Sequence, residues 1–243
     1  MIRIPLKWIV AVVLTLLVAG GAAWYGYVLP VERITIVDAQ HADADQLLRL
    51  ARVDTSMAMH EVDAGLVADR VRRHPWVAGA NVLRMPDGTL RIRVTERTPV
   101  ALALDGNGDA AFYLDARGYA MPATDAAVFY VPLVRGVQSP SHPTRPVASA
   151  ALRALLVDLA AMDEEEATLT AEFVVTRGGI DAWTPATPSG RSLRVRLGDH
   201  SFARKISALD AFWHQSLLTH PTRDVATIDL RFDGQLITTG GDA

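Results

Sequence analysis

The chain of 243 residues carries a net charge of −3 at pH 7 and contains no cysteine. The lack of cysteine excludes disulfides and thiolate metal sites, and the lack of a broad basic field argues against a nucleic-acid-binding protein. Lysine occurs only at Lys7 and Lys205, which we interpret as compositional drift.

The N-terminal region contains one long stretch, residues 8–31, without a charged side chain. As a helix rising roughly 1.5 Å per residue it reaches about 36 Å, enough to cross a hydrocarbon core of about 30 Å. Arg3 and Lys7 precede the stretch and acidic residues follow it, so the positive-inside rule places residues 1–7 in the cytoplasm. We therefore predict a single transmembrane helix at 8–30 in the plasma (inner) membrane, with the bulk of the chain periplasmic.

The same segment also fits a cleavable signal peptide, because positive residues, an apolar core and small residues at 20–23 follow one another. Cleavage after Ala23 would release an exported protein without an anchor. The apolar character continues through 24–29, which a signal peptide does not require, and this favours a retained anchor. Both interpretations predict export.

Residues 31–98 predict a compact β-α-α-β-β module. Capping aspartates precede two short segments with helical periodicity, Pro75 stops the second segment, and Asp87-Gly88 separates two alternating runs as in a β-hairpin. The expected elements are a strand at 31–37, a helix at 46–51 capped by Asp43 or Asp45, a helix from Asp63 to about His74, and strands at 76–83 and 90–95.

Apolar and polar side chains alternate along the last of these strands. Ile92 and Val94 are therefore predicted to face the helices, and Arg91 and Arg93 to face away from them. The second helix is predicted to bury an apolar stripe of Leu66, Val67 and Val71.

Residues 99–243 predict a mainly antiparallel β domain with two helices. Short alternating or apolar runs bounded by turn residues indicate strands, and leucines or aromatics at helical spacing indicate the helices. The expected strands are 101–104, 112–114, 119–121, 172–176, 180–184, 193–197, 226–232 and 235–239, and the expected helices are 152–159 and 201–218. The complete fold class is thus an N-terminal transmembrane helix followed by two α+β domains.

Candidate catalytic and metal sites are few in this sequence. Asp105, Asn107 and Asp109 have the first ligands of a calcium loop, but its glycine and its final glutamate are missing, which favours a solvated turn. The acidic run at 163–166 is interpreted as a solvated linker. No nucleophile elbow or phosphate loop occurs. We predict no catalytic, cofactor-binding or metal-binding residue; the alternative is an anchored exported enzyme acting on cell-wall material.

Four sequence motifs resemble the FtsQ/DivIB family of bacterial cell division proteins. They are His-Pro-Trp-Val at 74–77, Arg-Met-Pro-Asp at 84–87 with Thr-Leu-Arg-Ile-Arg-Val-Thr-Glu-Arg-Thr-Pro-Val-Ala at 89–101, Leu-Asp-Ala-Arg-Gly at 114–118, and Ile-Asp-Leu-Arg-Phe at 228–232. The second motif is the most specific. Gly88 departs from the family pattern as an insertion, and the loop at 185–190 has no counterpart that we can place.

The resemblance implies a POTRA-like domain at 31–98 and an FtsQ-like β domain at 99–243. It also implies a non-enzymatic scaffold that recruits membrane-anchored division proteins of FtsB/FtsL type at the septum, without nucleic acid, cofactor or small-molecule substrate. A third interpretation, a POTRA protein of outer-membrane insertion, would need a long series of barrel strands that this chain lacks room for.

A partner-binding site is expected at the C-terminal end of the chain. Residues 235–239 contain no charge and no later segment is expected to cover their outer edge, which makes them suitable for pairing with a strand of another protein. In the resembling family this region receives a partner strand. We predict apolar contacts from Phe232 and from Leu236 or Ile237, and backbone hydrogen bonds from 235–239. The expected site residues are Arg231, Phe232, Gln235, Leu236, Ile237, Thr238 and Thr239.

Overall fold

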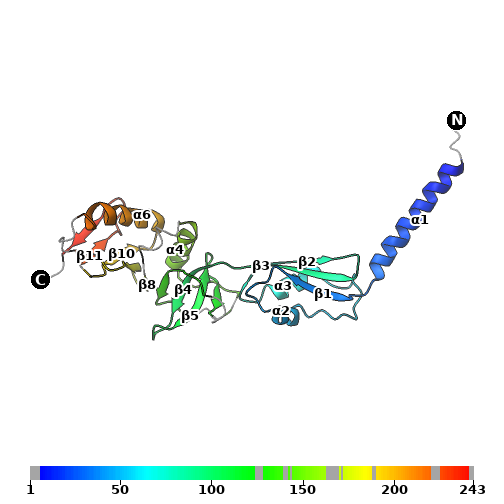
Figure 1. Ribbon diagram of the computed structural model, residues 1–243, viewed down its shortest axis with the longest axis horizontal. Coiled ribbons are helices and arrows are strands. Elements are labelled where there is room, and N and C mark those ends of the chain that lie inside the picture. Colours follow the sequence, from blue (N-terminus) through cyan, green and yellow to red (C-terminus); the bar gives the residue numbers. More distant parts are fainter. Residues whose placement is uncertain are drawn as a thin grey trace. The chain divides into compact units, whose positions relative to one another are not determined.

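The computed structural model describes residues 6–123, 128–138, 142, 144–162, 170, 172–187, 190–219 and 225–240. The chain divides into two compact units, the first ending at Glu96 and the second beginning at Arg97. Figure 1 shows both units and labels many of their helices and strands.

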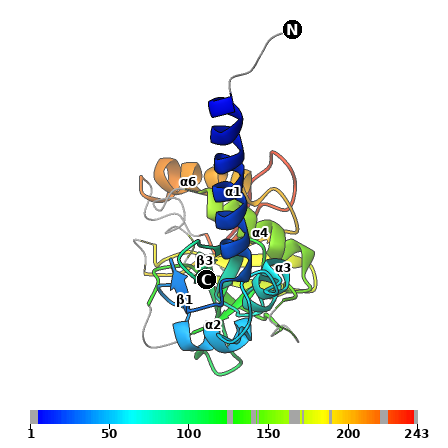
Figure 2. The same ribbon diagram turned by 90° about the vertical axis from the view of Figure 1, so that its right-hand side faces the viewer.

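The chain begins with helix α1, Leu6–Val28, drawn in dark blue in Figures 1 and 2. Its large apolar side chains that are described, from Trp8 to Tyr25, are exposed. Nowhere in the described part of the chain is a helix both long and apolar enough to cross a membrane. The predicted transmembrane helix at 8–30 is therefore not confirmed, although a helix does form there.

The first unit contains a three-stranded sheet and two helices. The strands are β1 Arg33–Val37, β2 Val77–Arg84 and β3 Thr89–Glu96, and the helices are α2 Ala44–Ala51 and α3 Ala64–Val71. The strand order is β1-β3-β2, with β1 parallel and β2 antiparallel to the central β3. The predicted β-α-α-β-β order is thus confirmed.

Side-chain caps fix the starts of both helices in this unit. The carboxylate of Asp43 accepts hydrogen bonds from the N–H groups of Asp45 and Gln46, and that of Asp63 accepts from the N–H of Leu66 at 3.0 Å. The prediction that Leu66 is buried is wrong: the residue is 44% exposed, because it lies on the outer side of α3. The core is formed instead by Leu47, Val67, Val71, Leu90, Ile92 and Val94.

Gly88 gives the β2–β3 hairpin its shape. Its φ of +77° lies in the left-handed region that glycine adopts without strain. Its carbonyl accepts hydrogen bonds from the N–H groups of Glu32 at 2.9 Å and Arg33 at 3.4 Å. The inserted glycine therefore ties the hairpin to the start of β1.

The second unit is built on one nine-stranded sheet in the order β12-β11-β10-β9-β8-β7-β4-β5-β6. Five of its neighbouring strand pairs are antiparallel and three are parallel, which confirms a mainly antiparallel domain. The strands are β4 Pro99–Leu104, β5 Ala110–Asp115, β6 Ala120–Pro122, β7 Leu133–Arg135, β8 Glu172–Thr176, β9 Gly179–Trp183, β10 Arg194–Gly198, β11 Thr227–Asp229 and β12 Ile237–Thr239.

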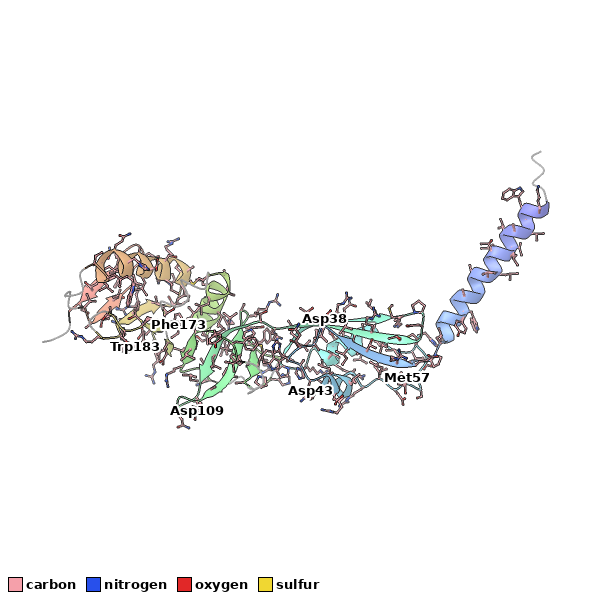
Figure 3. The ribbon with its side chains drawn as sticks, viewed as in Figure 1. Asp38, Asp43, Met57, Asp109, Phe173 and Trp183 are labelled. Atoms are coloured by element: carbon pink, nitrogen blue, oxygen red, sulfur yellow. The ribbon has the colours of Figure 1, made fainter. Side chains whose placement is uncertain are left out.

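Two helices connect parallel strands of this sheet and form its core. Helix α4, Ala150–Ala161, joins β7 to β8, and helix α6, Phe202–Phe212, joins β10 to β11. Leucines of α4 and Phe202, Ile206 and Leu209 of α6 form one buried cluster with Phe173 of β8. Trp183 of β9 is instead 39% exposed, whereas Phe173 is fully buried; Figure 3 labels both residues.

Several element boundaries differ from the sequence prediction. Strand β7 was not predicted, since three residues are too few for an alternating pattern. The helix expected at 201–218 is α-helical only to Phe212 and continues as a π-helical turn, η1, over Trp213–Leu217. The strand expected at 226–232 ends at Asp229, and the one expected at 235–239 begins only at Ile237.

Candidate partner-binding edge

The last strand, β12, forms one edge of the nine-stranded sheet. It pairs antiparallel with β11, with Asp229 opposite Ile237 and Thr227 opposite Thr239. No strand in the described part of the chain pairs with the other side of β12. A strand in this position has main-chain N–H and C=O groups available to an added strand.

A tight turn leads from β11 to this edge. Gly234 has φ +73°, and the N–H of Gln235 donates to the carbonyl of Phe232 at 3.2 Å. Gln235 and Leu236 lie between the turn and β12 rather than in the strand. The strand hydrogen bonds predicted for 235–239 can therefore come from 237–239 only.

The apolar residues of the predicted site have different environments. Phe232 is 53% exposed and Ile237 is 43% exposed. Leu236 is half-buried and packs against the core of the second unit. Of the two alternatives left open by the sequence, the structure thus offers Ile237 rather than Leu236 as an accessible apolar partner for Phe232.

Arg231 is fixed by Asp229 at the end of β11. The guanidinium donates from Nη2 to Asp229 Oδ2 at 2.6 Å and from Nε to Oδ1 at 2.9 Å, and the Arg231 N–H donates to Oδ1 at 3.1 Å. These hydrogen bonds lower the pKa of Asp229 despite its partial burial, and raise that of Arg231. The pair holds the segment that presents Phe232.

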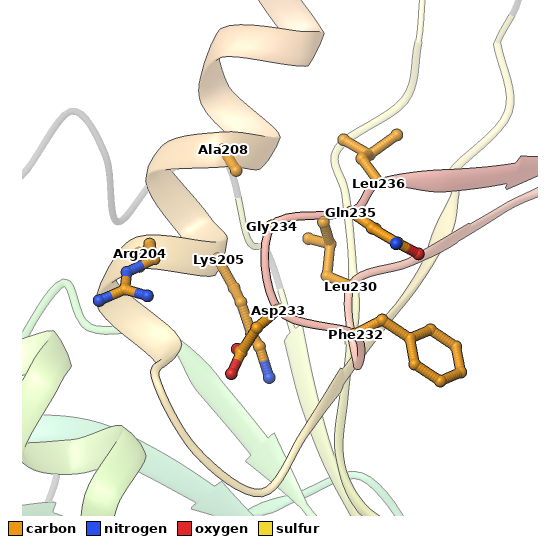
Figure 4. A pocket seen from close by; sticks show the side chains of 9 residues that line it. All are labelled: Arg204, Lys205, Ala208, Leu230, Phe232, Asp233, Gly234, Gln235 and Leu236. Atoms are coloured by element: carbon orange, nitrogen blue, oxygen red, sulfur yellow. The ribbon is translucent and has the colours of Figure 1, made fainter.

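A pocket of about 150 Å³ lies beside this segment and against α6 (Figure 4). Ala208, Leu230 and Leu236 provide apolar walls, Arg204 and Lys205 provide positive charge, and Asp233 provides one carboxylate. Lys205 is only 5% exposed, and its Nζ donates to the carbonyl of Leu197 at 2.7 Å. Sequence reasoning missed this pocket, although the isolated lysine of the C-terminal unit was a signal for it.

The structure brings the seven predicted residues together along one turn and one edge. Thr238 is half-buried, and Thr239 and Gln235 are exposed. Gln235 also lines the pocket. The predicted site residues and the pocket are therefore continuous.

The other candidate sites from the sequence either form a turn of the fold or lie outside the described residues. The carboxylate of Asp105 accepts the N–H groups of Asn107 at 2.8 Å and Asp109 at 3.0 Å, which makes a turn between β4 and β5. The acidic run at 163–166 lies outside the described residues. Among the described residues, no group of three or more His, Asp or Glu side chains is placed to hold a metal ion.

Comparison with known proteins finds a matching family model for each of the two units. Residues 29–97 match the family model "POTRA domain, FtsQ-type", and residues 98–239 match "FtsQ/DivIB, C-terminal related". The chain is 46% identical over 220 residues to the cell division protein FtsQ of Rhodothermus marinus, covering 89% of this chain and 80% of that protein. It is 43% identical over 234 residues to the FtsQ of Salinibacter ruber, covering 92% and 90%. The chain therefore belongs to the FtsQ/DivIB family of cell division proteins.

Proposed function

We propose that this cell division protein is a non-enzymatic scaffold whose C-terminal edge captures an extended segment of another membrane-anchored division protein. The captured segment pairs with β12 as an additional strand. The family resemblance supports partners of FtsB/FtsL type and a site of action at the septum.

The observation that carries the proposal is the open edge at β12 beside two exposed apolar side chains. Charged side chains and bulges ordinarily protect an exposed edge from pairing with other chains. Residues 235–239 contain no charge. Backbone pairing would supply affinity, and contacts to Phe232 and Ile237 would supply selectivity.

We further propose that the N-terminal segment 8–30 anchors the chain in the plasma membrane with residues 1–7 cytoplasmic, and that the POTRA-like domain at 31–98 and the β domain at 99–243 lie in the periplasm. The uncharged sequence of 8–31, the exposed apolar side chains along α1 and the basic residues Arg3 and Lys7 support this arrangement. An anchor would confine capture to the membrane surface where division partners are inserted.

The capture site is tested with paired variants of the full chain in cells depleted of the native protein. Phe232→Ala removes an apolar side chain at the edge. Ile237→Asp replaces a second apolar side chain with a charged one. Tyr130→Ala and Val128→Asp make matched changes at exposed residues outside the edge. Each variant is affinity-purified from solubilised membranes, and co-purified FtsB- and FtsL-type proteins are quantified by mass spectrometry.

We expect the two edge variants to lose these partners and to leave long cells without septa. The two control variants should retain the partners and restore division. Equal partner recovery by the edge and control variants would contradict capture at β12. Lysis without filamentation on depletion would instead favour an enzyme acting on the cell wall.

A further inference from the structure

The pocket between α6 and the 230–236 turn has the chemistry of a site for an acidic side chain. We propose that it receives a glutamate or aspartate of the captured segment, with the apolar stem against the pocket walls and the carboxylate on Lys205. This inference rests on the proposed capture of an extended segment at β12, and it specifies which residue type the partner must carry.

Lys205 is the central group of the argument. Its side chain is almost fully buried, yet its ammonium group has three N–H donors and the structure gives it one acceptor, the Leu197 carbonyl. In the described part of the chain Lys205 forms no ion pair. A buried cation with a single neutral acceptor is unfavourable, and an entering carboxylate would neutralise it.

The acidic residues near Lys205 have another partner. His200 Nδ1 lies 2.6 Å from Asp199 Oδ1, and His200 Nε2 lies 3.8 Å from Asp233 Oδ1. Asp199 and Asp233 are both largely exposed, and Asp233 also lines the pocket, but in the described part of the chain neither carboxylate forms an ion pair with Lys205. The hydrogen bond from His200 and, more weakly, the charge of Lys205 lower the pKa of Asp199. His200 is the direct partner of both carboxylates, and the Lys205 ammonium keeps two N–H donors for a ligand.

The rest of the pocket fits the stem of such a side chain. Ala208, Leu230 and Leu236 supply apolar surface, and Arg204 adds a second positive charge. Gln235 and Leu236, which immediately precede β12, line the pocket, so in this proposal the acidic residue belongs to the part of the captured segment that lies beside them. Figure 4 shows Lys205 extending from α6 toward the turn residues.

The charge preference is tested with a pair of small probes, 4-methylpentanoate and 4-methylpentanamide. Both have the same branched apolar chain, and only the first carries a carboxylate. Each probe is titrated into the full chain in a mild detergent, and backbone amide chemical shifts are followed by NMR. We expect shifts at 204–208 and 230–236, with the carboxylate binding roughly tenfold more tightly than the amide, as for a hydrogen bond to a charged group.

Three variants identify the origin of this preference. Lys205→Met should lose most of the preference for the carboxylate, with a small remainder from Arg204. Ala208→Leu should block the pocket while leaving Lys205 in place, because Ala208 is exposed and leucine is a good helix former. Ala203→Leu makes the same change at an exposed position of α6 outside the pocket lining and should bind as the unsubstituted chain does. Equal affinity of the unsubstituted chain for both probes, or an undiminished preference in Lys205→Met, would overturn the assignment.

Partner capture separates this inference from the proposed function. If Ile237→Asp loses the division partners and Ala208→Leu retains them, capture at β12 stands and the role of the pocket is wrong. If both variants retain the partners, the proposed capture site itself is wrong. Loss of the partners in both, with Ala203→Leu unaffected, is the expected result.

Discussion

Glu96 and Arg97 are neighbours in the chain, but their side chains form hydrogen bonds within different units. The Glu96 carboxylate accepts the backbone N–H groups of residues 40–42 at 2.7–2.9 Å in the first unit. Arg97 Nη1 donates to Asp115 Oδ2 at 2.6 Å in the second unit, and its guanidinium lies 4.0 Å from the centre of the Tyr119 ring. The Glu-Arg pair of the family signature thus secures the last residue of one unit and the first residue of the next.

The first prediction concerns Glu96→Gln. Burial alone raises the pKa of Glu96, but the hydrogen bonds from Ala42, His41 and Gln40 outweigh burial and the pKa is lowered from its ordinary value of 4.5. The ionised carboxylate therefore stabilises the first unit at neutral pH, and this contribution is lost as the pH falls below about 4.5 through the folded-state pKa. We expect Glu96→Gln to destabilise the first unit by about 1–3 kcal/mol at pH 7.

Hydrogen exchange of β3 amides measured from pH 7 to pH 3 checks this expectation. The variant should be less protected at pH 7 and should approach the unsubstituted chain as the pH falls. An unchanged difference across the whole range would contradict a role for the carboxylate charge.

The second prediction concerns Arg97→Met. Both partners of the Arg97–Asp115 pair are only 10% exposed, so removing the cation leaves a buried carboxylate. The loss should be limited to about 1–3 kcal/mol, because Asp115 Oδ1 still accepts the N–H groups of Arg117 and Tyr119. Hydrogen exchange should rise in β4 and β5 and stay unchanged in β1–β3. Increased exchange in both units would show that the two anchors are not separate.

The third prediction tests the facing of β3. Ile92 is fully buried, so Ile92→Asp places an unpaired carboxylate in the core and should unfold the first unit. Arg93 is exposed and its contact with Asp38 at 3.4 Å is solvent-screened, so Arg93→Ala should change stability by less than about 1 kcal/mol. Circular dichroism melts of the two variants compare these outcomes. Similar melting of both would show that the strand faces the other way.

The first unit could be read from the sequence in most of its detail. Strict alternation in β3, aspartate caps before both helices and the Asp87-Gly88 hairpin are local signals, and each one agrees with the fold. The burial of Leu66 was predicted wrongly because the apolar residues of an eight-residue helix are compatible with more than one buried stripe. Which of these stripes is buried depends on the sheet against which it packs.

The second unit was less predictable because its architecture depends on contacts that are distant in sequence. β7 has three residues, and its place between β4 and β8 is set by parallel pairing. The edge strand was predicted from the absence of charged residues at 235–239 and from the Asp233-Gly234 turn before them. The pocket was missed because Lys205 and Leu236 meet only through tertiary packing.

The fourth prediction concerns the N-terminal helix. A reporter that is active only in the periplasm, fused after Ala243, should be active, and the protein should stay in the membrane fraction after a carbonate wash. The basic residues Arg3 and Lys7 before the apolar stretch predict this orientation. Recovery of a soluble form beginning near Trp24 would instead establish cleavage of a signal peptide.

The last prediction removes residues 235–243. The truncation deletes β12 and the half-buried Leu236, but β11 remains paired with β10 and the cluster around Ile228, Phe202 and Phe173 remains complete. We expect a folded protein with a lowered melting temperature that no longer captures FtsB- and FtsL-type partners, because the outermost strand and its exposed Ile237 are gone. A melt with a single cooperative transition for the second unit serves as the folding control. Undiminished capture by that folded truncation would place the partner site on another part of the chain.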